Sequence, residues 1–434
     1  MQINFEKIYN FLLGTTLFLY PLGIYGLTPF DFFRQEKNSF FISFAHIFLV
    51  IFSLSISPLL DKKKIYLLIL MIIFAFLPLI TLNDNLQLRN LISYEYYGSK
   101  NTLLYLITLF TFGLIVFEKT KYKNVFFFFK IILLAILISS SFHILQFLSF
   151  TIFKYKFYAI FCEQITFICS DTYSYVSKYN YMGKLMRSSG LGGATNSSIS
   201  YLIPGLYISL LFFYKTKNNI FVYIYLFITL AVFSTLSRLS ILLTLISLFL
   251  LFVYFLRENN FYKNNKAKIT LNNLKFTLVF FTFLFLLLTL LISDKFNPFN
   301  YRNFNEYYRI FQNIIFAITV SLENYGLGVG YHIIDDYLFF NTDVNLWGTH
   351  SNLAQLIGGL GIFVLIIFIY FLFNSFNKLN LKKVLNIVLS FLVISFLIMG
   401  ILKTYLLNIY GVFFLSIYLK ILYVDQNIKL NNKT

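Results

Sequence analysis

The stretch Ile220–Leu256, IFVYIYLFITLAVFSTLSRLSILLTLISLFLLFVYFL, decides how this chain folds. About 20 apolar residues are enough for one helix to cross a bilayer, so this stretch is too long for a single span. Polar residues and Arg238 interrupt it at Ser234-Thr-Leu-Ser-Arg-Leu-Ser240. The sequence therefore predicts two membrane spans, at 219–235 and 239–256, joined by a tight turn.

Apolar runs of the same kind recur along all 434 residues, which are 59% hydrophobic and only 12% charged, with a mean hydropathy of +0.75. A soluble domain carries about 25% charged residues. The first run is too long for a signal-peptide core and lacks an A-x-A site, so we expect it to stay as an anchor. We expect an all-α polytopic membrane helix bundle in which residues 1–434 form one integral-membrane domain. The twelve expected spans are 8–27, 39–60, 65–82, 101–117, 126–150, 198–214, 219–235, 239–256, 275–293, 351–373, 384–402 and 405–422.

The charge distribution predicts the orientation of these spans. With the N-terminus inside, the cytoplasmic segments hold more than half of the 35 basic residues and fewer than a third of the 17 acidic ones. This positive-inside asymmetry predicts that both termini are cytoplasmic and that two long loops, 151–197 and 294–350, lie outside. The net charge of +18 then reflects basic loops that face anionic lipid headgroups. The expected partner is the lipid bilayer, and nucleic acid is not expected as a partner.

The first outer loop contains both cysteines and one candidate arginine. Cys162 and Cys169 could form a disulfide in an oxidising compartment or remain two thiols, and both alternatives stay open. Their spacing is not that of a C-x-x-C metal site. Arg187 precedes Ser188-Ser-Gly-Leu-Gly-Gly193, just ahead of the next span.

The second outer loop predicts a helix followed by a glycine-rich turn. The segment Asn305-Glu-Tyr-Tyr308-Arg309 opens it, and apolar residues then recur at helical spacing up to Ile318. We expect this helix to lie along the membrane surface or to pack over the bundle. Tyr325-Gly-Leu-Gly-Val-Gly330 follows, without the strand and helix of a βαβ unit, so we expect a tight turn or close backbone approach rather than nucleotide binding.

His350, at the outer mouth of span 351–373, is the first candidate for chemistry. The positive end of that helix favours a neutral imidazole and attracts anions. A neutral histidine near a phosphate can accept a proton from a sugar hydroxyl. The alternative is an interfacial histidine that caps the helix.

The arginines of the outer face are the second group of candidates. Arg187, Arg238 and Arg309 each present a planar fork that suits phosphate. A guanidinium at the edge of the hydrocarbon is costly unless it is paired. Each arginine could instead reach toward headgroups or pair with an outer acid such as Glu306.

In this order, and on one face, the motifs resemble the O-antigen polymerase and O-antigen ligase superfamily of bacterial surface-polysaccharide assembly. The residues that carry the resemblance are Arg187-Ser-Ser-Gly190, Ser237-Arg238, Tyr308-Arg309 followed by Gly326-Leu-Gly-Val-Gly330, and His350-Ser-Asn352. The His-Asn pair of that family is interrupted here by Ser351.

The resemblance implies an inverting glycosyl transfer, without metal or cofactor, at the outer face of the bacterial inner membrane. The donor would be an oligosaccharide on undecaprenyl diphosphate. Arg309 and Arg238 would hold the leaving diphosphate, and His350 would orient or deprotonate the acceptor hydroxyl. Arg187, Tyr308 and Asn352 would contact the substrate. A chain-length regulator and a flippase of the same pathway are the implied protein partners.

Three functions remain open at this point. A polymerase, which we favour, adds glycan to a lipid-linked repeat unit, whereas a ligase adds it to lipid A–core. A lipid-linked oligosaccharide flippase or other transporter would place charges and broken helices near the midplane. Here the candidate charges lie at the outer rim, and the two halves of the chain differ in loop placement.

Overall fold

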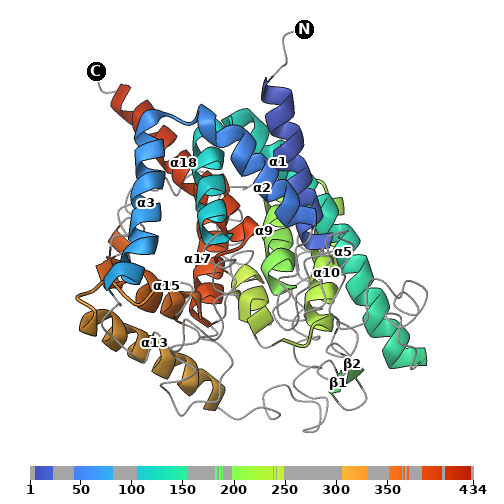
Figure 1. Ribbon diagram of the computed structural model, residues 1–434. Helices are drawn as coiled ribbons and strands as arrows, with labels where there is room; N and C mark the ends of the chain where they lie inside the picture. The colour runs from blue at the N-terminus through green and yellow to red at the C-terminus, as the bar shows by residue number, and fades with distance from the viewer. Residues whose placement is uncertain are drawn as a thin grey trace. The chain divides into compact units, whose positions relative to one another are not determined.

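In the computed structural model of this chain, the regular secondary structure of the described residues is helical apart from one short hairpin (Figure 1). The structure describes residues 5–22, 44–81, 105–153, 181–182, 185–186, 188, 198–237, 239–240, 242–248, 305–330, 334, 351–363, 365–366, 369–370, 384–402 and 406–431. The helical class expected from the sequence is confirmed for these residues.

Most of the elements overlap the predicted spans, whereas the span predicted at 275–293 lies outside the described residues. The α-helices are α1 (Phe5–Leu22), α2 (Phe44–Ile56), α3 (Lys62–Thr81), α5 (Val125–Phe153), α9 (Ile199–Thr216), α10 (Ile220–Ser234), α13 (Asn305–Glu323), α15 (Asn352–Leu360), α17 (Val384–Leu402) and α18 (Ile409–Asn431). A further helix covers 105–119, and single 3-10 turns form η2 (Ser57–Leu59) and η4 (Tyr122–Asn124). Strand β1 (Tyr181–Met182) pairs antiparallel with β2 (Leu185–Met186), in the first predicted outer loop.

Three helical segments in the described part of the chain are long and apolar enough to cross a membrane. They are Tyr122–Phe153, Ile199–Thr216 and Leu385–Leu402. They coincide with the predicted spans 126–150, 198–214 and 384–402. Shorter apolar helices lie at Ile47–Leu59, Ile220–Ser234, Phe311–Glu323 and Ile409–Leu422. These helices support a multi-pass membrane protein.

The turn predicted in the long apolar stretch is present. Helix α10 ends at Ser234, Leu236 has a φ of 48°, and helical structure resumes at 239. Two hydroxyl groups form hydrogen bonds to backbone carbonyls in the last turn of the helix. Ser234 Oγ donates to the carbonyl of Ala231 at 2.7 Å, and Thr235 Oγ1 donates to that of Val232 at 2.7 Å. Small hydroxyl residues therefore satisfy carbonyls that lose their helical partners where α10 stops.

The chain divides into two compact units. Unit 1 comprises Met1–Ile131 and Phe304–Thr434, and unit 2 comprises Ile132–Asn303. In unit 1, contacts between phenylalanine rings join separate helices: Phe52 lies 5.5 Å from Phe112, edge-on, and Phe129 lies 5.7 Å from Phe414, tilted, between ring centroids. Aromatic pairs of this kind add to the stabilisation that comes from burial alone.

In unit 2, α9 is buried along most of its length and packs on α10. Gly205 permits the close approach, because a Cβ added there would lie 2.7 Å from Ile136 Cγ2 and 2.9 Å from Ile228 Cδ1. Helices α5, α9 and α10 therefore meet around Gly205. The polar site described next lies on these three helices.

Candidate functional site

A fully buried histidine on α5 links this helix to α9 and, through Ser188, to the end of α10. His143 Nδ1 lies 2.8 Å from Ser188 Oγ, and its Nε2 lies 3.2 Å from the hydroxyl of Tyr201 on α9. Ser188 Oγ also lies 2.6 Å from Ser234 Oγ, at the end of α10. All four side chains are buried. We call this set (His143, Ser188, Tyr201 and Ser234) the histidine network.

His143 is not among the site residues predicted above, although its sequence neighbours carry a signal. Ser139, Ser140, His143 and Gln146 recur at helical spacing within an otherwise apolar span, and the structure buries all of them. Polar groups inside a span are costly unless they are paired, so such a stripe predicts a buried polar contact. What the sequence could not give was the partner, because Ser188 lies 45 residues away.

The histidine network joins the sequence neighbours of two predicted arginines. Ser188 directly follows Arg187, and Ser234 comes shortly before Arg238. The Ser188 N–H donates to the Ser234 carbonyl at 2.9 Å. The two motif segments are thus held together by a backbone hydrogen bond as well as by their hydroxyls. The two arginines themselves lie outside the described residues.

In unit 1, the glycine-rich turn packs against helix α15, which lies beside α13 (Figure 1). Gly326, Gly328 and Gly330 all have positive φ, between 74° and 105°. The N–H of Val329 donates to the Gly358 carbonyl at 2.7 Å, and that of Gly330 donates to the Gly359 carbonyl at 3.0 Å. The predicted tight turn with close backbone approach is confirmed.

The same contacts divide the predicted span 351–373, which is a correction to the sequence analysis. Helix α15 ends at Leu360, and Gly361 has a φ of 96°. In an uninterrupted helix the Ile362 N–H would bond to the Gly358 carbonyl. It donates instead to Ser321 Oγ on α13, at 2.9 Å. Both groups have found partners on another segment, so the helix breaks without leaving either unsatisfied.

The start of α15 carries one predicted substrate contact, Asn352, which is buried. Its Oδ1 accepts from the N–H groups of Leu406 and Leu407, at 2.8 and 3.3 Å, and its Nδ2 donates to Gln355 Oε1 at 3.0 Å. Ser351 caps the helix by accepting from the Ala354 N–H at 3.3 Å. These contacts fix α15 to the turn before α18. A contact between Asn352 and substrate stays a prediction.

The remaining predicted site residues are placed only in part. Tyr308 and Arg309 belong to the first turns of α13, whose predicted start at Asn305 is confirmed. Their side chains lie outside what the structure describes. His350 immediately precedes the N-cap Ser351, and it lies outside the described residues, as do Cys162 and Cys169.

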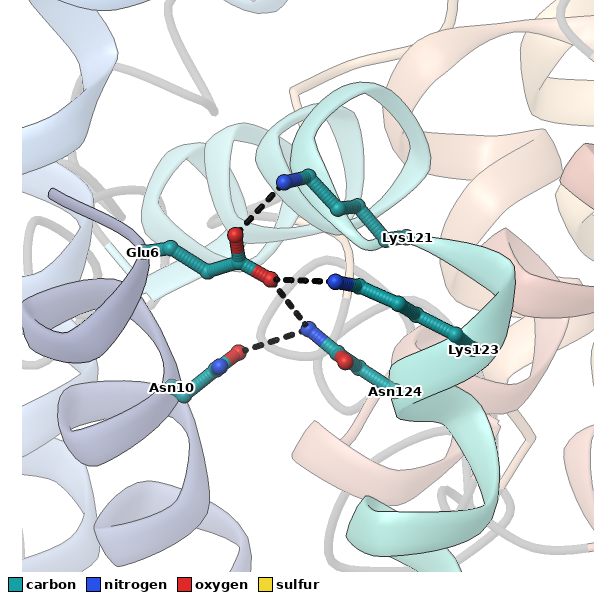
Figure 2. Close-up of polar contacts among 5 residues, drawn as sticks. All are labelled: Glu6, Asn10, Lys121, Lys123 and Asn124. Atoms are coloured by element: carbon teal, nitrogen blue, oxygen red, sulfur yellow. Dashed lines mark hydrogen bonds and ion pairs between the residues drawn. The ribbon is translucent and has the colours of Figure 1, made fainter.

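Charged residues of unit 1 gather around two glutamates. Glu6, at the start of α1, accepts from Lys121 Nζ at 2.5 Å and from Asn124 Nδ2 at 3.2 Å, and Lys123 lies 3.6 Å away (Figure 2). Asn124 Nδ2 also donates to Asn10 Oδ1 at 3.3 Å. Hydrogen bonds from Lys121 and Asn124 hold the pKa of Glu6 below its ordinary value.

The second glutamate, Glu118, lies between several cations. Lys119 and Lys64 approach its carboxylate to 2.6 and 3.2 Å, and the Asp61 N–H donates to it at 3.2 Å. Lys420 on α18 donates to the Glu118 carbonyl at 3.0 Å. These residues and those around Glu6 form the charged cluster: Glu6, Asp61, Lys64, Glu118, Lys119, Lys121, Lys123 and Lys420. In the predicted topology, each of these residues lies in a cytoplasmic segment or at the cytoplasmic end of a span.

In the part of the chain that the structure describes, no three His, Cys, Asp or Glu residues gather closely enough to hold a metal ion. Comparison with known proteins found no matching family model, no matching curated protein and no matching solved structure.

Proposed function

We propose that this chain is a multi-pass enzyme of the bacterial inner membrane that polymerises a surface polysaccharide of the O-antigen type. It transfers glycan from an undecaprenyl-diphosphate-linked donor to a lipid-linked repeat unit at the outer face. The observation that carries the proposal is the 2.9 Å hydrogen bond between the Ser188 N–H and the Ser234 carbonyl. It joins the segment that follows Arg187 to the segment that precedes Arg238. This pairing of segments supports a donor site at which Arg187 contacts the substrate while Arg238 holds the diphosphate.

The charged cluster supports the orientation that this function needs. It draws together residues from the start of α1, from the 61–64 turn, from the 118–123 connection and from α18. In the predicted topology all four segments are cytoplasmic, and they carry the excess of lysine that favours that side. Leu406, which precedes α18, meets Asn352, and both are predicted to lie at the outer face. A topology of twelve alternating spans with both termini inside accounts both for the charged cluster on the cytoplasmic side and for the contact of Leu406 with Asn352 on the outer side.

The proposed chemistry follows from the charge that develops on the donor. As the bond between the sugar and the diphosphate breaks, negative charge accumulates on the leaving lipid diphosphate. Arg309 and Arg238 offset that charge, and Arg187 binds the donor with them. His350 takes the proton from the acceptor hydroxyl as its oxygen attacks the anomeric carbon from the opposite side. Tyr308 and Asn352 contact the glycan.

The test is polymerisation in vesicles that contain the purified full chain and lipid-linked repeat units as the only glycan. We expect chains of several repeats to accumulate on lipid. Arg309→Lys keeps the charge but loses the two-pronged contact, so we expect turnover to fall at least about tenfold. The matched control is Arg257→Lys, on the predicted cytoplasmic side, which should leave turnover unchanged. Full turnover with Arg309→Lys would remove the diphosphate contact from the proposal.

The break at Gly361 favours a second candidate, a flippase or other transporter of lipid-linked oligosaccharide. Discontinuous membrane helices line the binding sites of many transporters. The same vesicles separate the two functions, because a transporter moves the glycan across the bilayer without lengthening it. Addition of lipid A–core separates the polymerase from a ligase, which transfers glycan only when this acceptor is present.

A further inference from the structure

The hydrogen bonds of the histidine network have a direction that can be worked out from its one fixed acceptor. The Ala231 carbonyl can only accept, so Ser234 Oγ uses its single proton in the 2.7 Å bond to it. Ser188 Oγ lies 2.6 Å from Ser234 Oγ. Because Ser234 has no second proton, Ser188 must donate in this contact.

The protonation of His143 follows from the same count. Ser188 Oγ has spent its proton on Ser234, so in the 2.8 Å contact with His143 Nδ1 it must accept. Nδ1 therefore carries the proton. In a neutral imidazole the other nitrogen accepts, so Nε2 takes its hydrogen bond from the Tyr201 hydroxyl, 3.2 Å away. The opposite tautomer would leave two hydroxyl oxygens 2.6 Å apart with no proton between them.

The resulting chain of donors runs from Tyr201 through His143, Ser188 and Ser234 to the end of α10. Ser188 is held by three hydrogen bonds, because its Oγ both accepts and donates and its N–H bonds to the Ser234 carbonyl. The histidine thus connects α5 and α9 to a loop residue that has no regular secondary structure of its own. This series of hydrogen bonds is neutral and each of its protons has an acceptor. It therefore suits a buried position, where an unpaired polar group is costly.

We propose that His143, as the Nδ1–H tautomer, is a positioning residue that fixes Ser188 against the end of α10. It thereby sets the two neighbouring arginines, Arg187 and Arg238, for the donor diphosphate, and this second step rests on the proposed function. His143 itself contacts neither donor nor acceptor.

The tautomer is tested by nuclear magnetic resonance of the full chain in lipid vesicles, with labelled histidine. The chain has 4 histidines, and the signal of His143 is the one that His143→Gln removes. We expect Nδ1–H at neutral pH. A signal from the Nε2–H form, or from a charged ring, overturns the assigned direction of the chain.

Positioning is tested by hydrogen exchange at the Ser188 amide. In His143→Leu, which cannot donate to Ser188, we expect exchange there to accelerate at least about tenfold. His143→Asn places an amide N–H near the position of Nδ1, so we expect it to restore much of the protection. The matched control is Ser209→Ala, which removes a buried hydroxyl of α9 that bonds only within its own helix, to the Leu206 carbonyl at 2.8 Å. Equal exchange in His143→Leu and Ser209→Ala overturns the positioning role.

Polymerisation by the same variants separates the two proposals. We expect kcat/KM for the lipid-linked donor to fall at least about tenfold in His143→Leu, to recover in His143→Asn and to stay unchanged in Ser209→Ala. If the wild type polymerises and His143→Leu equals the control, the link between His143 and the arginines is wrong. If the tautomer and exchange results hold but the wild type makes no polymer, the proposed function is wrong and the structural role of His143 stands.

Discussion

The two ends of the apolar part of α18, Ile409–Leu422, are held in unlike ways. Near the end of this part, Lys420 donates to the Glu118 carbonyl within the charged cluster, whose ion pairs are partly exposed. Just before its first residue, Leu406 and Leu407 donate to the buried side chain of Asn352. Helix α15, which carries Asn352, also accepts hydrogen bonds on its carbonyls from N–H groups of the glycine-rich turn. The end at Lys420, which we call the charged end, is held by ion pairs that water can reach. The end at Leu406 and Leu407, together with α15 and the glycine-rich turn, is held by buried uncharged groups, and we call it the uncharged end.

The difference between exposed ion pairs and buried hydrogen bonds predicts which end fixes the relative positions of its segments. An exposed ion pair contributes about 0–1 kcal/mol, because water and salt replace it readily. A buried hydrogen-bonding group that loses its partner costs about 1–3 kcal/mol. The charged end is therefore tolerant of change, whereas the uncharged end allows one arrangement. The uncharged end is also the one that leads into His350 in the sequence.

The largest effect is expected from Gly328→Ala, at the uncharged end. Gly328 has a φ of 74°, and an added Cβ would lie 2.5 Å from the Gly358 carbonyl oxygen and 3.0 Å from its carbon. Backbone atoms cannot move aside as a flexible side chain can. Strain and clash together should cost at least about 3 kcal/mol, measured as a fall in Tm of the detergent-solubilised chain.

The matched control for this substitution is Gly14→Ala, in helix α1. An added Cβ there would meet Ile131 Cδ1 at 3.1 Å, the far end of a flexible side chain. Alanine favours a helix by about 1 kcal/mol over glycine, so we expect Tm to stay level or rise. If Gly328→Ala melted with the control, the contact between the glycine-rich turn and α15 would not hold the uncharged end.

An intermediate effect is expected from Asn352→Ala. Two backbone N–H groups lose their acceptor in a buried place, so the chain should lose about 2 kcal/mol. Asn324→Ala is the comparison: its Nδ2 donates to the Val320 carbonyl of α13, the helix that Asn324 follows, at a partly exposed position, and the loss should stay below about 0.5 kcal/mol. Equal Tm values for these two variants would contradict the structural role of Asn352.

The uncharged end also contains both features that the sequence predicts and features that it does not. Helix α13 and the turn at 234–240 were predicted, because hydrophobic period and polar interruptions are local signals. The close approach of the glycine-rich turn was predicted from its glycines. The break at Gly361 was not, because it depends on Ser321 and Val329 supplying the partners that the helix gives up. Such contacts between segments distant in the sequence produce no periodic pattern of residues from which they could be predicted.

The site divides in the same manner. Asn352 was selected for its motif, and its buried contacts with the turn before α18 emerged only when the chain was folded. His143 was overlooked because nothing near it in sequence suggests Ser188 or Ser234 as partners. Residue type and order predicted where chemistry could lie. The pairing of segments more than 40 residues apart required the structure.

The smallest effects are expected at the charged end, from Glu118→Gln and Glu6→Gln. Partial burial alone would raise the pKa of Glu118, but hydrogen bonds from Lys119, from the Asp61 N–H and from Lys64 outweigh it and hold that pKa below its ordinary value of 4.5. A lowered pKa in the folded state means that the carboxylate stabilises the fold at pH values above the ordinary pKa. This stability is lost as the pH falls through the lowered value.

At pH 7 we expect Glu118→Gln to lower stability by about 1 kcal/mol or less, with a weaker effect from Glu6→Gln, whose carboxylate is more exposed. Two measurements identify the cause as charge. Raising the salt concentration should shrink the difference in Tm between wild type and Glu118→Gln, since salt screens exposed pairs. Lowering the pH below the folded-state pKa should remove most of it, because the wild-type carboxyl is then neutral as well. A deficit that persisted at high salt and at low pH would mean that Glu118 acts through packing, and the contrast between the two ends of the apolar part of α18 would not be one of charge.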